Sequence, residues 1–188
     1  MLACVAGEAI ALSLSALLGA FVSRLSDDGS GLAFFMPFVG ALEGAVLGAF
    51  QAWALGRDRA WIGATSLALG AAWLVGAIAS TFEPRASSTL LILGVALLFG
   101  LLVGALVGVA QARTSHRRAS HRWIIANVAA WSTGMVASAL LSEMVPWGPF
   151  TGYVFAIEAL KGVTVGLCLA LITGPYRADV IAPPEPPV

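Results

Sequence analysis

Six apolar segments, each long enough to cross a bilayer as a helix, constrain the fold of this chain more than any other feature. A hydrocarbon core of about 30 Å requires about 20 predominantly apolar residues per helix. The segments cover residues 2–22, 32–55, 60–81, 89–112, 123–143 and 151–174. Charged residues make up only 11% of the chain, whereas soluble domains contain about 25%. We therefore expect an all-α protein, an integral membrane bundle of six transmembrane helices.

A glycine pattern occurs twice, once in the second segment and once in the fourth. Each copy has glycines at intervals of four residues and then a glutamine: Gly40, Gly44, Gly48 and Gln51, and Gly100, Gly104, Gly108 and Gln111. Helices in lipid gain no hydrophobic free energy from association, so close van der Waals contact and interhelical hydrogen bonds hold them together. Small residues at this spacing form a groove for a partner backbone. We predict helix packing at these residues, either within the chain or in a homo-oligomer.

Weaker copies extend the repeat over the whole membrane region. The sixth segment has Gly162 and Gly166, with Leu169 in the place of the glutamine. In the odd-numbered segments, Trp73 and Trp131 each begin a similar glycine-containing stretch. The chain therefore divides into three tandem helical hairpins, which cover about residues 1–56, 57–114 and 115–175.

Each hairpin crosses the membrane twice, so every copy enters from the same side. Parallel repeats of this kind are related by an axis along the membrane normal, which predicts a pseudo-threefold arrangement. The hairpins form a single six-helix transmembrane domain, residues 1–175. We expect the proline-rich cytoplasmic tail, residues 176–188, to be disordered or polyproline-like from Pro175 onward.

Basic residues between the segments predict the orientation. Seven arginines fall on the side that holds both termini, and two, Arg24 and Arg85, fall on the other side. Cytoplasmic loops carry an excess of Lys and Arg. We therefore expect a multi-pass protein of the bacterial inner (plasma) membrane, with both termini cytoplasmic. Trp61 and Trp123 lie at the cytoplasmic starts of two segments, where an aromatic belt is expected.

Four ionisable residues lie inside the predicted spans: Glu8, Glu43, Glu158 and Lys161. A charge at the bilayer centre costs about 2.5–3.5 kcal/mol on insertion scales, so such residues usually face the bundle interior and pair. Glu43 precedes Gly44 and Lys161 precedes Gly162, which are equivalent positions in two copies of the repeat. We predict a buried intramembrane charge cluster of Glu43, Glu158 and Lys161, in which Glu43 pairs with Lys161.

Three interpretations of this cluster remain open. They are a neutralised pair that fixes helix register, a proton- or ion-coupled transport site, and a recognition point for a partner helix. Glu8 lies nearer the cytoplasmic face, where we expect its side chain to reach the interface or to stay protonated.

Polar residues near the cytoplasmic ends also have alternative roles. Gln51 and Gln111 either join neighbouring helices through their amides or line a polar vestibule for a ligand. The loop between the fourth and fifth segments contains Arg117 and Arg118. Its positive charge orients the chain, and these arginines are predicted contacts for anionic lipid headgroups, at roughly 1 kcal/mol per basic residue.

No motif in the sequence indicates catalysis. The HExxH, P-loop and Rossmann patterns are absent. The two cysteines, Cys4 and Cys168, lie far apart in apolar segments, and no metal-ligand spacing is present. The formal net charge of zero does not favour nucleic acid as a partner. We expect a non-enzymatic protein with no cofactor, no metal and no nucleic-acid partner.

The glycine pattern is followed each time by a basic turn and a tryptophan. Gly44-x3-Gly48-x2-Gln51 leads to Arg57, Asp58, Arg59 and Trp61, and Gly104-x3-Gly108-x2-Gln111 leads to Arg117, Arg118 and Trp123. In this respect the chain resembles uncharacterised bacterial multi-spanning membrane proteins with repeated GxxxGxxQ/Trp hairpins, over about two thirds of its length. The resemblance implies no activity. In size and helix number the chain is also similar to substrate-binding subunits of energy-coupling-factor transporters, but the internal repeat argues against that family.

Two classes of function remain. The glycine grooves and the scarcity of polar atoms favour a scaffold or accessory subunit that packs within a larger membrane complex. The alternative is a small solute or ion transporter, or a channel subunit, that uses the buried Glu/Lys cluster. A dry, closed core and an exposed small-residue face would favour the scaffold, whereas a polar cavity that reaches the cluster would favour transport.

Overall fold

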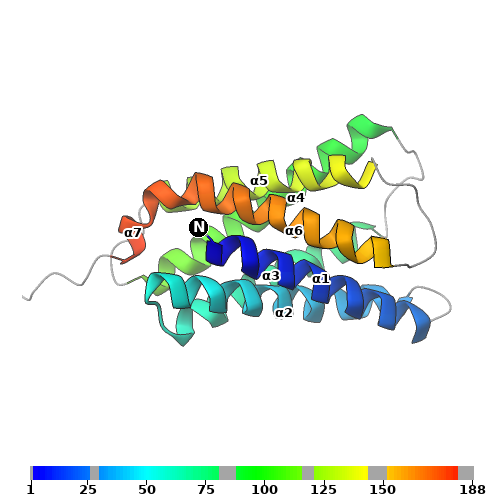
Figure 1. The fold of residues 1–188 in the computed structure, drawn as a ribbon, viewed down its shortest axis with the longest axis horizontal. Helices are drawn as coiled ribbons and strands as arrows, with labels where there is room; N and C mark the ends of the chain where they lie inside the picture. The colour runs from blue at the N-terminus through cyan, green and yellow to red at the C-terminus, as the bar shows by residue number, and fades with distance from the viewer. Residues whose placement is uncertain (1, 26–29, 81–87, 116–120, 144–151, 182–188) are drawn as a thin grey trace, which may run out of the picture.

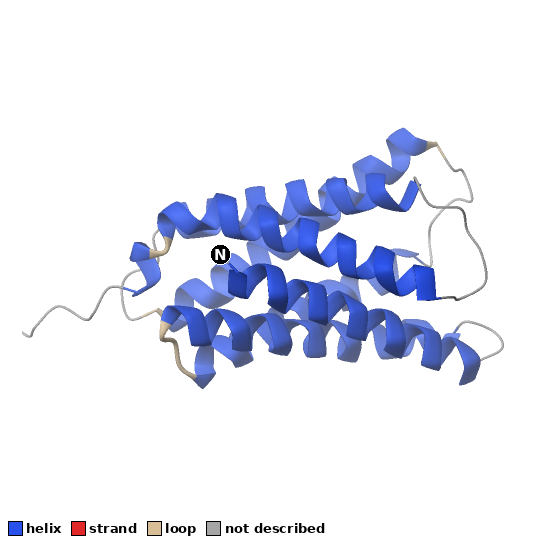
Figure 2. Cartoon of the chain, in the orientation of Figure 1, coloured by secondary structure: helices blue, strands red, loops and turns tan. Residues whose placement is uncertain are grey.

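The computed structural model describes residues 2–25, 30–80, 88–115, 121–143 and 152–181. Its six long helices run side by side (Figure 1): α1 (Leu2–Leu25), α2 (Ser30–Leu55), α3 (Arg59–Ser80), α4 (Thr89–Thr114), α5 (His121–Glu143) and α6 (Gly152–Thr173). Each of them is long and apolar enough to cross a membrane. No strand occurs among the described residues (Figure 2). The predicted all-α bundle of six membrane-length helices is therefore confirmed.

The sequence of the turn between α2 and α3 fixes its shape. Gly56 has a φ of +63°, a left-handed conformation that glycine adopts without steric cost. The backbone N–H of Arg57 can then donate to the carbonyl of Ala52 at 2.8 Å, which ends α2 in the usual glycine motif. Asp58 begins α3, since its side chain accepts from the backbone N–H of Trp61 at 3.4 Å.

The helices form a closed ring in which each helix contacts the next and α6 returns to α1. The most extensive contacts are α2–α3, α4–α5 and α6–α1, and the least extensive is α3–α4. The closest interfaces therefore join one hairpin to the next, rather than the two helices of one hairpin.

Glycines explain why these three interfaces are the closest. Gly44, Gly104 and Gly162 occupy the same position in the three copies of the repeat. A Cβ atom added to any of them would lie 2.5–2.6 Å from the neighbouring backbone: Gly44 from Thr65, Gly104 from Val128, and Gly162 from Ala9. Each even-numbered helix therefore presents the same glycine to the odd-numbered helix that follows it in the ring. This recurrence is the pseudo-threefold relationship that the repeat predicts.

The other predicted packing glycines also face a helix of this chain. Their nearest neighbours are Trp73 for Gly40, Ile62 for Gly48, Ser132 for Gly100, and Ile124 for Gly108. The stripes are thus filled from within the ring. These glycines therefore cannot pack against a second copy of the chain in this structure, because a helix of the same chain already contacts them.

The glycine contacts also show which residues of the odd-numbered helices are equivalent. The carbonyl groups nearest to Gly44, Gly104 and Gly162 belong to Thr65 in α3, Asn127 in α5 and Glu8 in α1, respectively. All three side chains are buried. One polar residue of each repeat therefore lies at the same depth in the ring.

This alignment corrects the predicted register of α3 and α5. It matches Trp131 with Leu69, which lies one helical turn from Trp73. The predicted match between Trp73 and Trp131 is therefore wrong. The tryptophans that the axis relates are Trp61 and Trp123, one turn before Thr65 and Asn127.

The chain stays ordered beyond α6. A short turn, η1 (Gly174–Tyr176), leads to a one-turn helix, α7 (Ala178–Ile181). Val180 of α7 is 3% exposed and packs against Trp61 and Trp123. The expectation of a disordered or polyproline-like tail from Pro175 is therefore wrong as far as Ile181, and residues 182–188 lie outside the described part of the chain.

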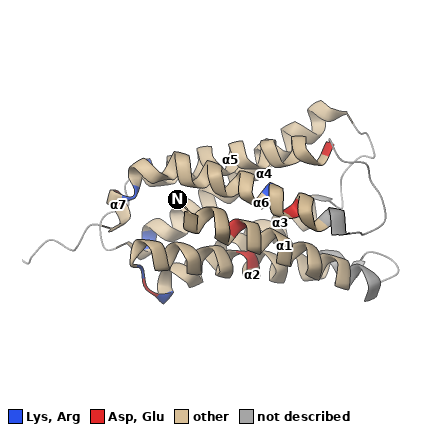
Figure 3. Ribbon diagram, viewed as in Figure 1, with Lys and Arg blue, Asp and Glu red and all other residues tan. Residues whose placement is uncertain are grey.

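Arginines gather at one end of the bundle, together with the N-terminus and α7 (Figure 3). We call this the basic end, and the opposite one the far end. The basic end contains Arg57, Arg59, Arg113, Arg122 and Arg177. The predicted lipid contacts Arg117 and Arg118 belong to the same loop region but lie outside the described residues.

Candidate functional site

Two glutamines meet inside the ring near the basic end. The Gln111 Nε2 group donates to the Gln51 Oε1 atom at 2.8 Å and to the Thr65 hydroxyl at 3.0 Å. The two glutamine oxygens also accept from the indole N–H groups of Trp61 and Trp123, each at 3.2 Å. All five side chains are buried. In the structure the glutamines thus join α2, α3, α4 and α5 across the interior.

The paired tryptophans are part of this network rather than of the surface. Trp61 and Trp123 are 0% and 3% exposed, and their ring centroids lie 5.9 Å apart. The predicted place in an interfacial aromatic belt is therefore wrong. The reason is that the indole N–H groups find their partners inside the ring. In the third repeat the corresponding residues are Cys4 and Leu169, so there the glutamine–tryptophan bond is missing.

Arg57 closes the ring at the basic end. Its guanidinium donates to the carbonyl of Val180 at 3.1 Å and to that of Thr114 at 2.6 Å, and its Cζ atom lies 5.4 Å from the centroid of the Trp61 ring. One side chain therefore ties the α2–α3 turn to α4 and to α7. No pattern around Arg57 predicts this role, because both carbonyl groups come from distant parts of the chain.

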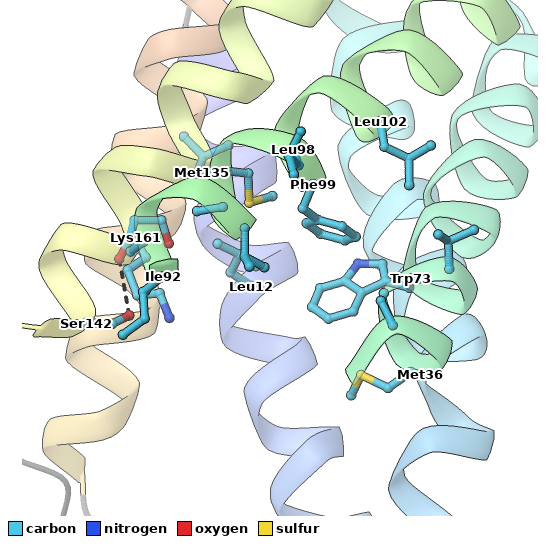
Figure 4. Close-up of a pocket in the computed structure, with 18 of the residues that line it drawn as sticks. Leu12, Met36, Trp73, Ile92, Leu98, Phe99, Leu102, Met135, Ser142 and Lys161 are labelled. Carbon is cyan, nitrogen blue, oxygen red and sulfur yellow. Dashed lines mark hydrogen bonds between the residues drawn. The ribbon is translucent and has the colours of Figure 1, made fainter. Parts of the chain in front are cut away.

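A cavity of about 810 Å³ occupies the half of the bundle toward the far end. All six long helices contribute to its lining. Trp73 and Phe99 form one wall with ring centroids 5.8 Å apart, and Leu12, Met36 and Met135 face the same space (Figure 4). Sites for small molecules usually measure about 300–1,000 Å³ and are mostly apolar with few polar groups. The cavity matches both descriptions.

The cavity opens at the side of the bundle, between α3 and α4. Val75 and Leu98 line it from these two helices and are 47% and 66% exposed. The opening coincides with the least extensive interface of the ring. In a membrane this opening would face lipid rather than water.

The polar wall of the cavity is an ion pair on α6. The Lys161 Nζ atom lies 2.8 Å from the Glu158 Oε1 atom, and the two side chains are 18% and 23% exposed. They are three residues apart, a spacing at which helix side chains meet. Ser142, across the cavity on α5, donates to the carbonyl of Ser138 at 3.1 Å. Two members of the predicted charge cluster are therefore together, but they are partly exposed rather than buried as predicted.

Glu43 takes no part in that ion pair. It is 1% exposed, and its Oε2 atom accepts from the Ser15 hydroxyl at 3.3 Å. Within the described residues no ion pair joins Glu43 to Lys161, so the predicted pairing of these two residues is absent. The reason is that Glu158, on the same helix as the lysine, already holds the ammonium group.

Glu8 is buried deep in the ring, so the first of its two predicted alternatives, a side chain that reaches the interface, is wrong. It is 0% exposed, and neither of its carboxyl oxygens has a hydrogen-bond partner among the described groups. Glu43, the buried carboxyl group of α2, belongs to the helix that packs beside α1 in the ring. The cause of the burial of Glu8 is the close packing of α1 on Gly162, which turns the position equivalent to Thr65 and Asn127 inward.

Six membrane-length helices in a closed ring, with polar groups turned inward, define a multi-pass α-helical membrane protein. Comparison with protein-family models, curated proteins and solved structures finds no match. The features of this chain that bear on its function are the cavity and the polar groups around it.

Proposed function

We propose that this protein binds a small amphipathic molecule in the cavity and carries it across or within the membrane, as a small solute transporter or a subunit of one. The observation that carries this proposal is that the cavity reaches the Glu158–Lys161 pair. An apolar wall and one charged pair in a single space suit a molecule with an apolar body and a charged group. In a purely structural core, neither the apolar wall nor the charged pair would need to be accessible.

The chemistry of the Glu158–Lys161 pair limits which polar group the solute can carry. A lysine ammonium has three donors, of which one is given to Glu158 at 2.8 Å. The remaining donors suit an anionic group, and the second carboxylate oxygen of Glu158 suits a cationic one. We therefore expect an anionic or zwitterionic polar group on the solute.

The closed basic end is consistent with one state of a transporter. Between the cavity and that end lie the buried side chains of Leu47 and Val107, then the glutamine pair, and then Arg57. Access is thus open at the side of the far half and closed at the basic end. Alternating access requires states that open to one side at a time.

We also propose the orientation and the membrane. Positive charge is retained on the cytoplasmic side, and five described arginines mark the basic end. The basic end would then be cytoplasmic, together with both termini, in the inner membrane of a bacterium.

A scaffold or accessory role within a membrane complex stays a prediction. The scaffold prediction depended on an exposed glycine face for a partner helix. In the structure, helices of this chain already pack against the described glycine stripes. It is therefore the second outcome of the test rather than a second proposal.

The test is purification in mild detergent, followed by mass spectrometry of the small molecules and proteins that co-purify. Ala139→Leu would fill part of the cavity from α5, and Ala129→Leu would add the same volume at an exposed position of the same helix. We expect one amphipathic solute with the wild type and with A129L, much less with A139L, and reduced retention with Lys161→Met.

Two results would contradict the proposal. One is a wild-type protein that carries no solute and gains no thermal stability from any amphipathic compound tested. The other is a stoichiometric protein partner whose retention does not change with A139L, which would favour the scaffold.

A further inference from the structure

Two carboxyl groups, those of Glu8 and Glu43, are enclosed together at the α1–α2 side of the ring. Both are almost completely buried, at 0% and 1% exposed. Three of their four oxygens have no hydrogen-bond partner among the described groups, and the fourth accepts only from Ser15. Figure 3 shows the acidic positions of α1 and α2 close together, midway along the bundle.

We propose that Glu8 and Glu43 form a proton-binding site inside the bundle, which holds at least one proton at neutral pH. Two adjacent carboxylates in a buried site cannot both be ionised, because burial disfavours each charge and the charges repel one another. Buried polar atoms are almost always hydrogen-bonded. A proton on either carboxyl group removes one of the two buried charges and gives that group an O–H donor.

The repeat singles out this site. The equivalents of Glu8 are Thr65 and Asn127, which are neutral and donate to the carbonyl groups of Trp61 and Trp123. The carboxyl group of Glu8 thus replaces a satisfied neutral side chain in only one of the three copies. Packing alone does not explain an acid at this position, since a threonine or asparagine fills it elsewhere in the same ring.

The neighbouring groups on every packed element favour a proton over a metal ion. Cys4 and Ser15 face the pair from α1, Trp73 from α3, and Glu158 from α6, where Lys161 is already bound to that glutamate. None of these groups offers Glu8 or Glu43 a free cation. Among the described residues no cluster of three His, Cys, Asp or Glu side chains could hold a metal ion.

The site lies beside the cavity. Trp73 lines the cavity and packs against Gly40, which lies one turn before Glu43 on α2. Leu12, one turn after Glu8 on α1, lines the cavity as well. The proposal itself does not depend on which solute the cavity binds, because it concerns only the protonation of this pair.

The test is infrared spectroscopy of the full-length protein in liposomes at neutral pH. A protonated carboxyl group gives a C=O band well separated from that of a carboxylate. Glutamate labelled with ¹³C at the side-chain carboxyl assigns the band to Glu, and transfer to D₂O shows an exchangeable proton. We expect such a band in the wild type. It should shift in frequency with Glu8→Gln or Glu43→Gln and disappear in the double variant.

Glu143→Gln is the matched control, because this glutamate is exposed at the end of α5, and the variant should leave the band unchanged. A labelled wild-type protein without a protonated-glutamate band at neutral pH would overturn the proposal, whether or not any variant folds. Persistence of the band in a folded E8Q/E43Q protein would overturn it as well. If the wild-type protein shows the protonated-glutamate band but binds no solute, that result would count against the proposed function alone.

Discussion

The two halves of this bundle are built from the same repeat and differ in what they do with polar groups. Toward the basic end, Gln51 and Gln111 bond to each other and to paired tryptophans, and Arg57 ties the helix ends together. Toward the far end, a cavity of about 810 Å³ interrupts the packing and an ion pair lies on its wall. One half is closely packed around a hydrogen-bonded network, whereas the other has space beside an ion pair.

The difference follows from where the repeat is kept and where it is lost. The glutamine and the tryptophan recur in two copies and meet across the ring. At the level of the ion pair, the equivalent positions are Glu43, Val103 and Lys161, three different kinds of side chain. Symmetric residues can share bonds around an axis, but asymmetric ones define a single site. This contrast teaches that the repeat specifies the scaffold and that departures from it mark the candidate function.

The largest effect should come from adding a methyl group at the closest helix contact. In Gly104→Ala the new Cβ would lie 2.5 Å from the Val128 Cα atom, which is backbone and cannot move aside. We expect a loss of about 3 kcal/mol in the free energy of unfolding, the upper part of the range for overpacking. The measurement is unfolding of the purified protein in detergent micelles.

Gly94→Ala, on the same helix, is the control. A Cβ at Gly94 has no neighbour within 4 Å, and alanine has the higher helix propensity, so this variant should be neutral or slightly more stable. Equal destabilisation by both variants would show that the glycines matter for helix flexibility and not for close packing.

Substitution of two alanines on α5 compares the packing of the two halves of the bundle directly. Ala130 is 0% exposed in the packed core, whereas Ala139 lines the cavity. Ala130→Leu should cost about 2 kcal/mol by overpacking, and Ala139→Leu should cost little, because the added carbons enter existing space. Thermal unfolding of the two variants measures the difference. Similar costs would mean that the cavity wall is as tightly packed as the core.

The glutamine network should give a smaller effect. Gln111→Leu removes bonds to Gln51, Thr65 and Trp123. Hydrogen bonds between membrane helices average about 0.6 kcal/mol, so a loss of about 1–2 kcal/mol is expected. The double variant with Gln51→Leu should cost less than the sum of the two single changes, because it leaves fewer groups unpaired. Strict additivity in this cycle would mean that the two amides act independently.

Much of the scaffold was predictable from the sequence, and the site was predictable only in part. Segment length and apolar content gave the six helices, since the bilayer sets both. The glycine spacing gave the packing faces of α2 and α4. The register of α3 against α5 was predicted one turn away, because Trp73 and Trp131 resemble each other locally while only the glycine contacts decide which residues meet.

The site residues show the same limit. The predicted cluster contained both Glu158 and Lys161, and these two residues form an ion pair. The sequence could not show that Glu8 faces Glu43, because this depends on the closure of the ring by α1 and α6. The alignment of Glu8 with Asn127 was the signal that could have revealed it. Interactions that depend on which helices become neighbours are not encoded in any one segment.

The smallest expected effect concerns the closure of the basic end. Arg57→Lys keeps the charge but loses the planar fork that donates to both Thr114 and Val180, and a lysine ammonium does not replace such two-point contacts. We expect less than about 1 kcal/mol in global stability, with faster hydrogen–deuterium exchange confined to α7. Arg59→Lys, at an exposed position on the same turn, should leave that exchange unchanged. If α7 exchanged at the same rate in wild type and R57K, burial of Val180 on the tryptophan pair would be sufficient to hold it. The closed state of the basic end would then depend on apolar contact rather than on the arginine.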